Sequence, residues 1–430
     1  MKRIWTDRQG SAAVLLTVLF SCLILMVTVL FTASKAAAGK SVIDATLQLA
    51  GRSVLSEYDK RLFSDYGLFA FKGDGLQVER DIVFYAAASL NKDKAPYALL
   101  TASGSKLRLF DYDLDIVSAN LKEYSLMNVN LFEQQLSDAA LSEWVRDKVA
   151  DHGASESESS ASPERTLRNQ SVIESLPSQG LSGIAFPDLS NIHIPTLSEI
   201  ADKTTDRVLA SEYILSVFKN ANGGAKSRDS FFENEVEYIL SGKTTDSANY
   251  SSVRTKLYLI RFALNNAALL RDPLKMAKVK AEAAPYAALF GIGEEVASGV
   301  ITEAWVVAET ENDMLLLEDD RNVALVKSAA TWAIQDINRI VERLAAGITN
   351  TDKVVLPPSA TGQSYEDYLR ILLFLTDRET KLLRAMDMIQ INLKGTYDRA
   401  FQIREYYVGF RFDALVGGEM YSYTERYDGG

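Results

Sequence analysis

The segment Asp7–Lys35, with the sequence DRQGSAAVLLTVLFSCLILMVTVLFTASK, decides how the rest of the chain is interpreted. It places Gly-Ser directly before an apolar run, and no charged side chain occurs from Gln9 to Ser34. As a helix, residues 11–33 would extend roughly 35 Å, enough to cross a hydrocarbon core of about 30 Å. Thirteen Leu, Ile, Val or Phe residues in this run favour membrane insertion by roughly 4 to 8 kcal/mol. The segment therefore predicts a basic leader over 1–10 and a transmembrane helix over 11–33.

Basic residues flank the predicted span on both sides. They are Lys2, Arg3 and Arg8 before it and Lys35, Lys40 and Arg52 after it. The leader charges are more tightly clustered and join the free amino terminus, so the positive-inside rule favours a cytoplasmic N-terminus. On this topology, everything after about residue 34 is extracytoplasmic.

A secretory signal peptide is an alternative interpretation of the same segment. The sequence Ala36-Ala37-Ala38 offers an A-x-A-like cleavage site, but the apolar run is longer than the usual stretch of about 7–15 residues. Small residues follow the apolar region in a signal peptide, whereas here Gly10 and Ser11 precede it. This order favours a helix that the mature protein keeps.

The stretch Arg8-Gln9-Gly10-Ser11-Ala12-Ala13-Val14, which runs from a basic residue through Gly and small residues into the apolar run, carries a resemblance to known proteins. It resembles the start of type IV prepilin-like proteins, and in particular the TadG and TadE pilus-assembly proteins of tad (Flp) loci. The resemblance implies that a prepilin peptidase cuts between Gly10 and Ser11. Major pilins carry a Glu at the fifth position after the cut, which pairs with a neighbour's amino terminus, but this chain has Leu15 there. The departure favours a TadG-like or tip-like accessory protein over a polymerising pilin.

A second resemblance rests on five blocks spread along the chain. They are SVLSEYDKRLFSDYGLFAF (Ser53–Phe71), EVEYILSGK (Glu235–Lys243), IRFALNNAALLRD (Ile260–Asp272), VALVKSAATW (Val323–Trp332) and YEDYLRILL (Tyr365–Leu373). Together they resemble an uncharacterised family of membrane-anchored proteins from tad-like loci of Gram-positive bacteria. The resemblance implies an envelope location and association with pilus-type assembly, and it supplies no activity.

An amphipathic pattern continues beyond the apolar run and predicts a helical stem over 34–66. Its apolar residues recur at helical spacings: Val42, Ala45, Leu49, Leu55, Tyr58, Leu62 and Tyr66. Gly39 and Gly51 weaken a helix by about 1 kcal/mol each relative to Ala, which makes them candidate kinks. The small residues Ala36, Ala37, Ala38 and Gly39 would permit close helix packing near the membrane exit.

The rest of the chain predicts an α+β fold that is mostly helical. In segment 67–150, alternating residues predict strands at Gly67–Phe71 and Leu107–Leu121, and Asn130 with Glu133 predicts a capped helix to about Val149. Residues 151–180 are predicted to form a disordered linker, because Asp151–Arg165 is rich in Ser and Glu and has no aromatic residue.

Segment 181–430 is predicted to be a mostly helical domain with C-terminal antiparallel strands. Helical spacing predicts helices over 207–219, 247–270, 273–289, 294–317, 323–346 and 364–395. The stretch Phe231–Gly242 is more typical of a strand, and Tyr and Phe alternate with polar residues over Phe401–Tyr427, as in paired strands. Cross-strand packing is the favoured role of these tail tyrosines.

The composition argues against several classes of function. The 430 residues include 46 Lys or Arg and 57 Asp or Glu, and the net charge of −11 disfavours a nucleic-acid partner. The only cysteine, Cys22, lies in the apolar run, so no intrachain disulfide can form. With the two histidines His152 and His193, the chain has almost no means to build a Cys/His zinc site.

Two local patterns are similar to known chemical sites. Ser216 and Lys219 form the S-x-x-K of serine acyl-transfer enzymes, but the accompanying S-D-N and K-T-G elements are missing. In a strand, Asp111, Asp113 and Asp115 would share one face as Ca²⁺ candidates, but an EF-hand spacing is lacking and a solvated acidic face is favoured. No catalytic residue and no cofactor are expected.

These observations predict a single-pass membrane protein that is a pseudopilin-like structural or assembly component of a tad-type pilus or related secretion apparatus. The expected partners are the lipid bilayer, other subunits of the apparatus and a prepilin peptidase, and not nucleic acid. The alternative is a surface-anchored binding module, an adhesin or sensor, which an exposed aromatic patch on the tail strands would favour. An envelope hydrolase is a third class and would need a deep pocket near Ser216, Lys219 or a carboxylate pair.

Overall fold

The computed structural model describes residues 8–90, 112–149, 165–181, 206–223, 229–347 and 362–427. Within these ranges the chain is mixed α and β and mostly helical, and one apolar helix lies at its N-terminus, which confirms the predicted fold class at this level. The chain divides into two compact units. Unit 1 comprises Met1–Lys60, Phe69–Leu126 and Arg404–Asp428; unit 2 comprises Arg61–Leu68, Met127–Ile403 and Gly429–Gly430.

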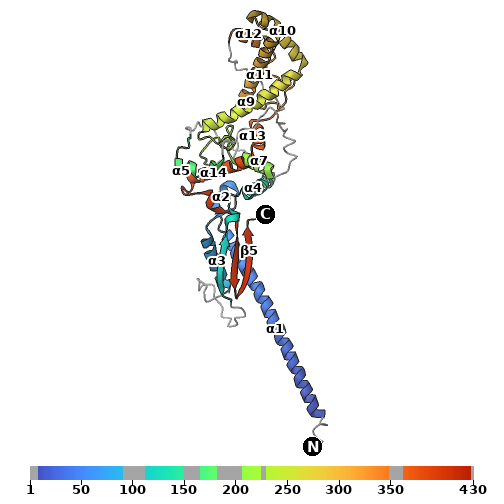
Figure 1. Ribbon diagram of the computed structural model, residues 1–430, viewed down its shortest axis with the longest axis vertical. Coiled ribbons are helices and arrows are strands. Elements are labelled where there is room, and N and C mark those ends of the chain that lie inside the picture. Colours follow the sequence, from blue (N-terminus) through green and yellow to red (C-terminus); the bar gives the residue numbers. More distant parts are fainter. Residues whose placement is uncertain are drawn as a thin grey trace. The chain divides into compact units, whose positions relative to one another are not determined.

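Unit 1 begins with helix α1 (Arg8–Leu55), drawn in blue in Figure 1. Residues 13–38 of this helix are exposed, whereas its C-terminal part buries five apolar side chains, of which the last is Leu55. The other four are Ile43, Leu47, Ala50 and Val54, whose three- and four-residue spacing puts them on one helix face. One continuous helix therefore has an uncovered apolar half and a half packed in unit 1.

The packed half of α1 lies with α3 (Gly75–Leu90) against a three-stranded antiparallel sheet. The strand order is β2 (Leu114–Asn120), β4 (Gly409–Val416) and β5 (Glu419–Arg426). Strands β4 and β5 form a hairpin whose turn residues, Gly417 and Gly418, both have positive φ; this is the conformation that favours glycine in two-residue hairpins. A smaller pair joins β1 (Phe71–Lys72) to β3 (Tyr406–Tyr407).

The C-terminal strands confirm the alternation seen in the tail, but they belong to a different unit from the one expected. They were predicted to belong to the domain over 181–430, whereas they pair with β2 and pack in unit 1. Unit 2 is therefore mainly a long insertion between the neighbouring strands β2 and β4. Of the stretch Gly67–Phe71, only Phe71 enters a strand.

Gly39 and Gly51 are sites of close approach rather than kinks, since α1 is continuous through both. A Cβ at Gly39 would collide with the hydroxyl of Tyr112, and a Cβ at Gly51 would lie 2.7 Å from Cγ of Glu425. The helix propensity lost at these two positions allows α1 to contact its own unit closely.

Unit 2 is helical in the residues that the structure describes. Its helices are α2 (Lys60–Tyr66), α4 (Val129–Val149), α5 (Gln170–Glu174), α7 (Asp206–Val217), α8 (Glu235–Ser241), α9 (Asp246–Arg271), α10 (Pro273–Phe290), α11 (Glu294–Glu318), α12 (Ile337–Ala345), α13 (Tyr365–Leu375) and α14 (Arg378–Thr396). Helix α14 is buried on all sides from Thr380 to Leu393 apart from Arg384, as expected of a central core helix. Helices α9 to α12 share a second core around Trp305 and Trp332. In Figure 1, α9 and α11 lead to α10 and α12 at the yellow end of this unit.

Several predicted boundaries differ from the structure because polar caps interrupt the apolar pattern. The stem is not one helix to residue 66, since α1 ends at Leu55 and α2 begins at Lys60. The span 364–395 is two helices, because Asp377 caps α14 by accepting from Thr380 N at 3.0 Å. Asn128, rather than Asn130, accepts the hydrogen bond at the start of α4.

Three other expectations in unit 2 were wrong at least in part. The stretch Phe231–Gly242, predicted as a strand, contains helix α8. Gly242 caps the C-terminus of this helix with a left-handed backbone conformation. Residues 323–336 are not helical, and only 337–345 of the predicted 323–346 helix forms. Residues 165–180 of the expected linker are ordered: α5 is followed by a 3₁₀ turn at Pro177–Gly180, and Leu167 is buried. Residues 151–164 lie outside the described ranges.

Candidate functional site

Helix α1 is long and apolar enough to cross a membrane, and its most apolar window is entirely uncovered. The hydroxyl groups of Thr17, Ser21, Thr28 and Thr32 are satisfied within the helix, as a hydrocarbon environment requires. Ser21 donates to the carbonyl of Thr17 and Thr28 donates to that of Ile24, both at 2.8 Å. By length, composition and polar satisfaction, this half of α1 is suited to lipid.

The predicted processing residues Gly10 and Ser11 both lie within the first turns of α1, which begins at Arg8. The residues that were expected to pack at the membrane exit differ in their exposure. Ala36, Ala37 and Ala38 are exposed, while Gly39 is buried beneath Tyr112 of the same unit.

The two chemical patterns are not assembled into sites in the described residues. The Ser216 hydroxyl donates to the carbonyl of Tyr213 at 3.0 Å, and Lys219 Nζ lies 3.6 Å from a carboxylate oxygen of Glu233. The S-x-x-K pair is therefore not joined by a hydrogen bond.

The predicted Ca²⁺ candidates Asp111, Asp113 and Asp115 do not form a metal site in the part of the chain that the structure describes. Asp113 and Asp115 are exposed, and Asp111 lies outside the described residues, as do His152 and His193. No group of three or more His, Cys, Asp or Glu side chains is suitably placed for a metal among the residues that were described.

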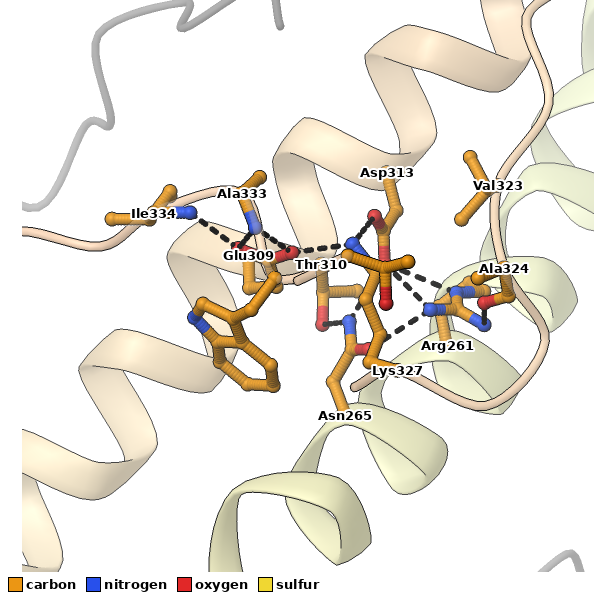
Figure 2. Close-up of polar contacts among 12 residues, drawn as sticks. Arg261, Asn265, Glu309, Thr310, Asp313, Val323, Ala324, Lys327, Ala333 and Ile334 are labelled. Atoms are coloured by element: carbon orange, nitrogen blue, oxygen red, sulfur yellow. Dashed lines mark hydrogen bonds and ion pairs between the residues drawn. The ribbon is translucent and has the colours of Figure 1, made fainter. Parts of the chain in front are cut away.

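A buried charge network, which sequence reasoning missed, joins α9, α11 and the loop 323–334 (Figure 2). Arg261 is fully buried and lies 2.8 Å from Asp313, and it donates to the carbonyls of Ala324 and Leu325 at 3.0 and 2.9 Å. Asn265, one turn along α9, donates to the same Asp313 oxygen at 2.8 Å. The guanidinium of Arg261 thus holds the first part of the loop through hydrogen bonds to the loop's backbone carbonyls.

The second half of the network holds the rest of that loop. Lys327 pairs with Glu309 and lies 2.6 Å from Asp313. Glu309 also accepts from the backbone N–H groups of Ala333 and Ile334, each at 2.8 Å. Burial raises the pKa of Glu309, and the Lys327 ammonium opposes that rise. Two cations and two carboxylates balance, so the charges can be buried together.

A second set of buried carboxylates begins helix α8. Glu235 accepts from the backbone N–H of Lys219 at 2.9 Å, and Glu237 accepts from that of Ala221 at 3.0 Å. Both side chains are fully buried. Burial raises the pKa of Glu237 to about 7, because no cation contacts it within the described residues to favour its charged form.

Asp387 of α14 is a third buried carboxylate, and it holds part of the expected linker. It accepts from the backbone N–H of Ser178 and from the hydroxyl of Tyr238, both at 3.0 Å. Burial raises its pKa to about 6 despite these hydrogen bonds.

Some of the buried charged residues lie in the blocks that carry the second resemblance. Glu237 lies in Glu235–Lys243, Arg261 in Ile260–Asp272 and Lys327 in Val323–Trp332. These charged positions among apolar residues were the available signal. In the structure they position loops.

The comparisons with known proteins give one match. Residues 148–418 match a protein family described as a family of unknown function (DUF5702). No curated protein and no solved structure matches the chain. Because the match spans well over half of the 430 residues, the protein belongs to the DUF5702 family.

Proposed function

We propose that the protein is a membrane-anchored, extracytoplasmic structural or assembly component of a tad-type pilus or related secretion apparatus. The observation that supports this most is the division of α1 into an uncovered apolar half and a half packed against an antiparallel sheet. A lipid-embedded helix that continues into a folded unit is the layout of pilin-like proteins, and it gives unit 1 a rigid connection to the membrane. In this proposal the leader is cytoplasmic and both units are outside.

The sequence around Gly10 and Ser11 adds a processing step to the proposal. Cleavage between them would free an amino terminus at the start of α1 and remove the basic leader. Leu15 cannot supply the carboxylate that would pair with a neighbour's amino terminus, so an accessory position is favoured over a repeated fibre subunit.

Intact mass and N-terminal sequencing of the protein from native membranes, with and without the cell's prepilin peptidase, tests this step. We expect a peptidase-dependent start at Ser11, which Gly10→Leu abolishes and the matched substitution Ala13→Leu leaves in place. A start at Met1 would indicate an uncut anchor, and a start at Gly39 a secreted protein. Either result would overturn the prepilin part of the proposal.

The alternative of a surface-anchored binding module loses the feature that was expected to favour it. The aromatic residues of the tail strands pack inward: Phe410 and Phe412 are buried, and Tyr423 is half-buried with its hydroxyl bonded to Asp44. The envelope hydrolase is not supported either, since Ser216 and Lys219 are not paired.

A further inference from the structure

We infer that a pocket at the corner between α9 and α10 binds a carboxylate joined to a small apolar group. The pocket has a volume of about 350 Å³ and is lined by residues between 264 and 275 and between 326 and 332. This volume lies at the small end of the range for ligand sites. The inference goes beyond the proposed function and does not depend on it.

One wall of the pocket is apolar. Leu264 and Ala268 of α9 contribute to it with Val326 and Trp332 of the loop. Val326 is 67% exposed, so the chain leaves a large aliphatic side chain uncovered at the pocket. An apolar group of a ligand would cover Val326, and each Å² of apolar surface removed from water in this way would favour binding by about 25 cal/mol.

The charges at the pocket favour a monoanion. Lys275 is held in place by Asp272, 2.7 Å from its ammonium, and by the ring of Trp332, whose centroid is 5.2 Å away. An ammonium can donate three hydrogen bonds, and Asp272 accepts one of them. Arg271 adds an exposed cation at the same pocket, while the charge of Lys327 is already balanced by the buried network. One positive charge is left in excess, which matches a carboxylate better than a dianionic phosphate.

Trp332 helps to position the Lys275 ammonium from the loop side of the pocket. It is 3% exposed and lines the pocket, and the centroid of its ring lies 5.2 Å from the Lys275 ammonium. This cation–π contact favours a fixed position of the ammonium.

The pocket is also where two of the sequence blocks meet. Apart from Pro273 and Lys275, every lining residue belongs to Ile260–Asp272 or Val323–Trp332. The buried network beneath fixes the loop that forms the second wall, because Glu309 holds its backbone at Ala333. The pocket is therefore preorganised rather than formed by a free loop.

Calorimetric titration of the full chain in non-ionic detergent tests the inference. The probes are N-acetyl-leucine and its neutral amide, and a tetrapeptide ending in leucine with a free or an amidated C-terminus. We expect each free acid that binds to do so at least about tenfold more tightly than its amide, since a charge-assisted hydrogen bond is lost in the amide. Binding of both acids points to a site open to small carboxylates; binding of the peptide alone identifies a polypeptide C-terminus, and binding of acetyl-leucine alone a free acid.

Three variants locate the site. Lys275→Met and Arg271→Gln are each expected to weaken acid binding about tenfold or more, and Lys278→Met, exposed one turn along α10, is the matched control. Arg271 is exposed, so its variant keeps the test valid if Lys275→Met fails to fold. Equal binding of acids and amides, insensitivity to Arg271→Gln, or no saturable binding up to about 10 mM would each overturn the inference.

Discussion

Replacing Glu237 with Gln should make unit 2 more stable at alkaline pH while leaving its stability in acid almost unchanged. Glu237 is fully buried, and one carboxyl oxygen accepts from Ala221 N at 3.0 Å and from the hydroxyl of Tyr365 at 2.8 Å. The other oxygen, Oε2, has no partner among the described residues. A Gln side chain keeps the shape and the accepting oxygen but carries no charge at any pH.

The sign follows from the pKa of Glu237, which burial raises from its ordinary value of 4.5 to about 7. Between these two values the folded protein keeps a proton that the unfolded chain has released, so the free energy of unfolding falls as pH rises. The fall starts above about pH 4.5 and is complete above about pH 7. The separation of the two pKa values corresponds to about 3 kcal/mol. Glu237→Gln removes this loss.

The assay is urea unfolding of the full chain in detergent at pH 5 and pH 8, followed by the fluorescence of Trp305 and Trp332, which are buried in unit 2. We expect the difference in unfolding free energy between variant and wild type to grow by about 2–3 kcal/mol from pH 5 to pH 8. Glu303→Gln, an exposed carboxylate on α11, is the control and should show little change. A pH-independent difference for Glu237→Gln, or one that shrinks towards pH 8, would refute the reasoning.

Three further variants, one of them a double substitution, probe other parts of the structure. Lys327→Met removes one cation from the buried network and should lower the unfolding free energy of unit 2 by about 3–5 kcal/mol in urea titrations, because buried Glu309 loses its cationic partner and Asp313 keeps only Arg261. Gly362→Ala places a Cβ 2.8 Å from the backbone of Val323 and should cost about 1–3 kcal/mol in the same assay. Leu19→Arg combined with Leu23→Arg opposes insertion by about 6 kcal/mol, so the protein should become extractable from membranes by alkaline carbonate. The matched controls are Lys278→Met, exposed on α10; Gly299→Ala, which meets open space; and Leu49→Arg, on the packed half of α1. Indistinguishable behaviour of any variant and its control would contradict the corresponding argument.

Local patterns in the sequence predicted the elements whose cause is local. The apolar run gave the membrane-length helix, and the three- and four-residue spacing gave α9, α10 and α11 almost to the residue. The alternation in the tail gave β4 and β5. These signals depend on which face of one segment is buried, and that information lies within the segment.

The errors arose where a distant partner decides the local structure. Residues 323–334 have a helical spacing, yet Arg261 and Glu309 take up the backbone groups that a helix would use within itself. The partner of the tail strands, β2, lies nearly three hundred residues earlier, so pairing could not be deduced from the tail alone. Buried Glu237 and Lys327 look like members of a solvated face until their partners are known.

The proposed accessory role rests on two features that are independent of each other. Leu15 is a property of the membrane helix and removes a charge that a repeated subunit would use against its neighbour's amino terminus. The insertion of Met127–Ile403 is a property of topology, and it fills the connection between two adjacent strands with most of the mass of the chain. A subunit that repeats along a fibre must present two complementary surfaces at every step. A large insertion in the connection between paired strands adds bulk to every copy, whereas a subunit used once, at an end or in the membrane, needs only one of those surfaces. Both features therefore favour the same position, for different physical reasons.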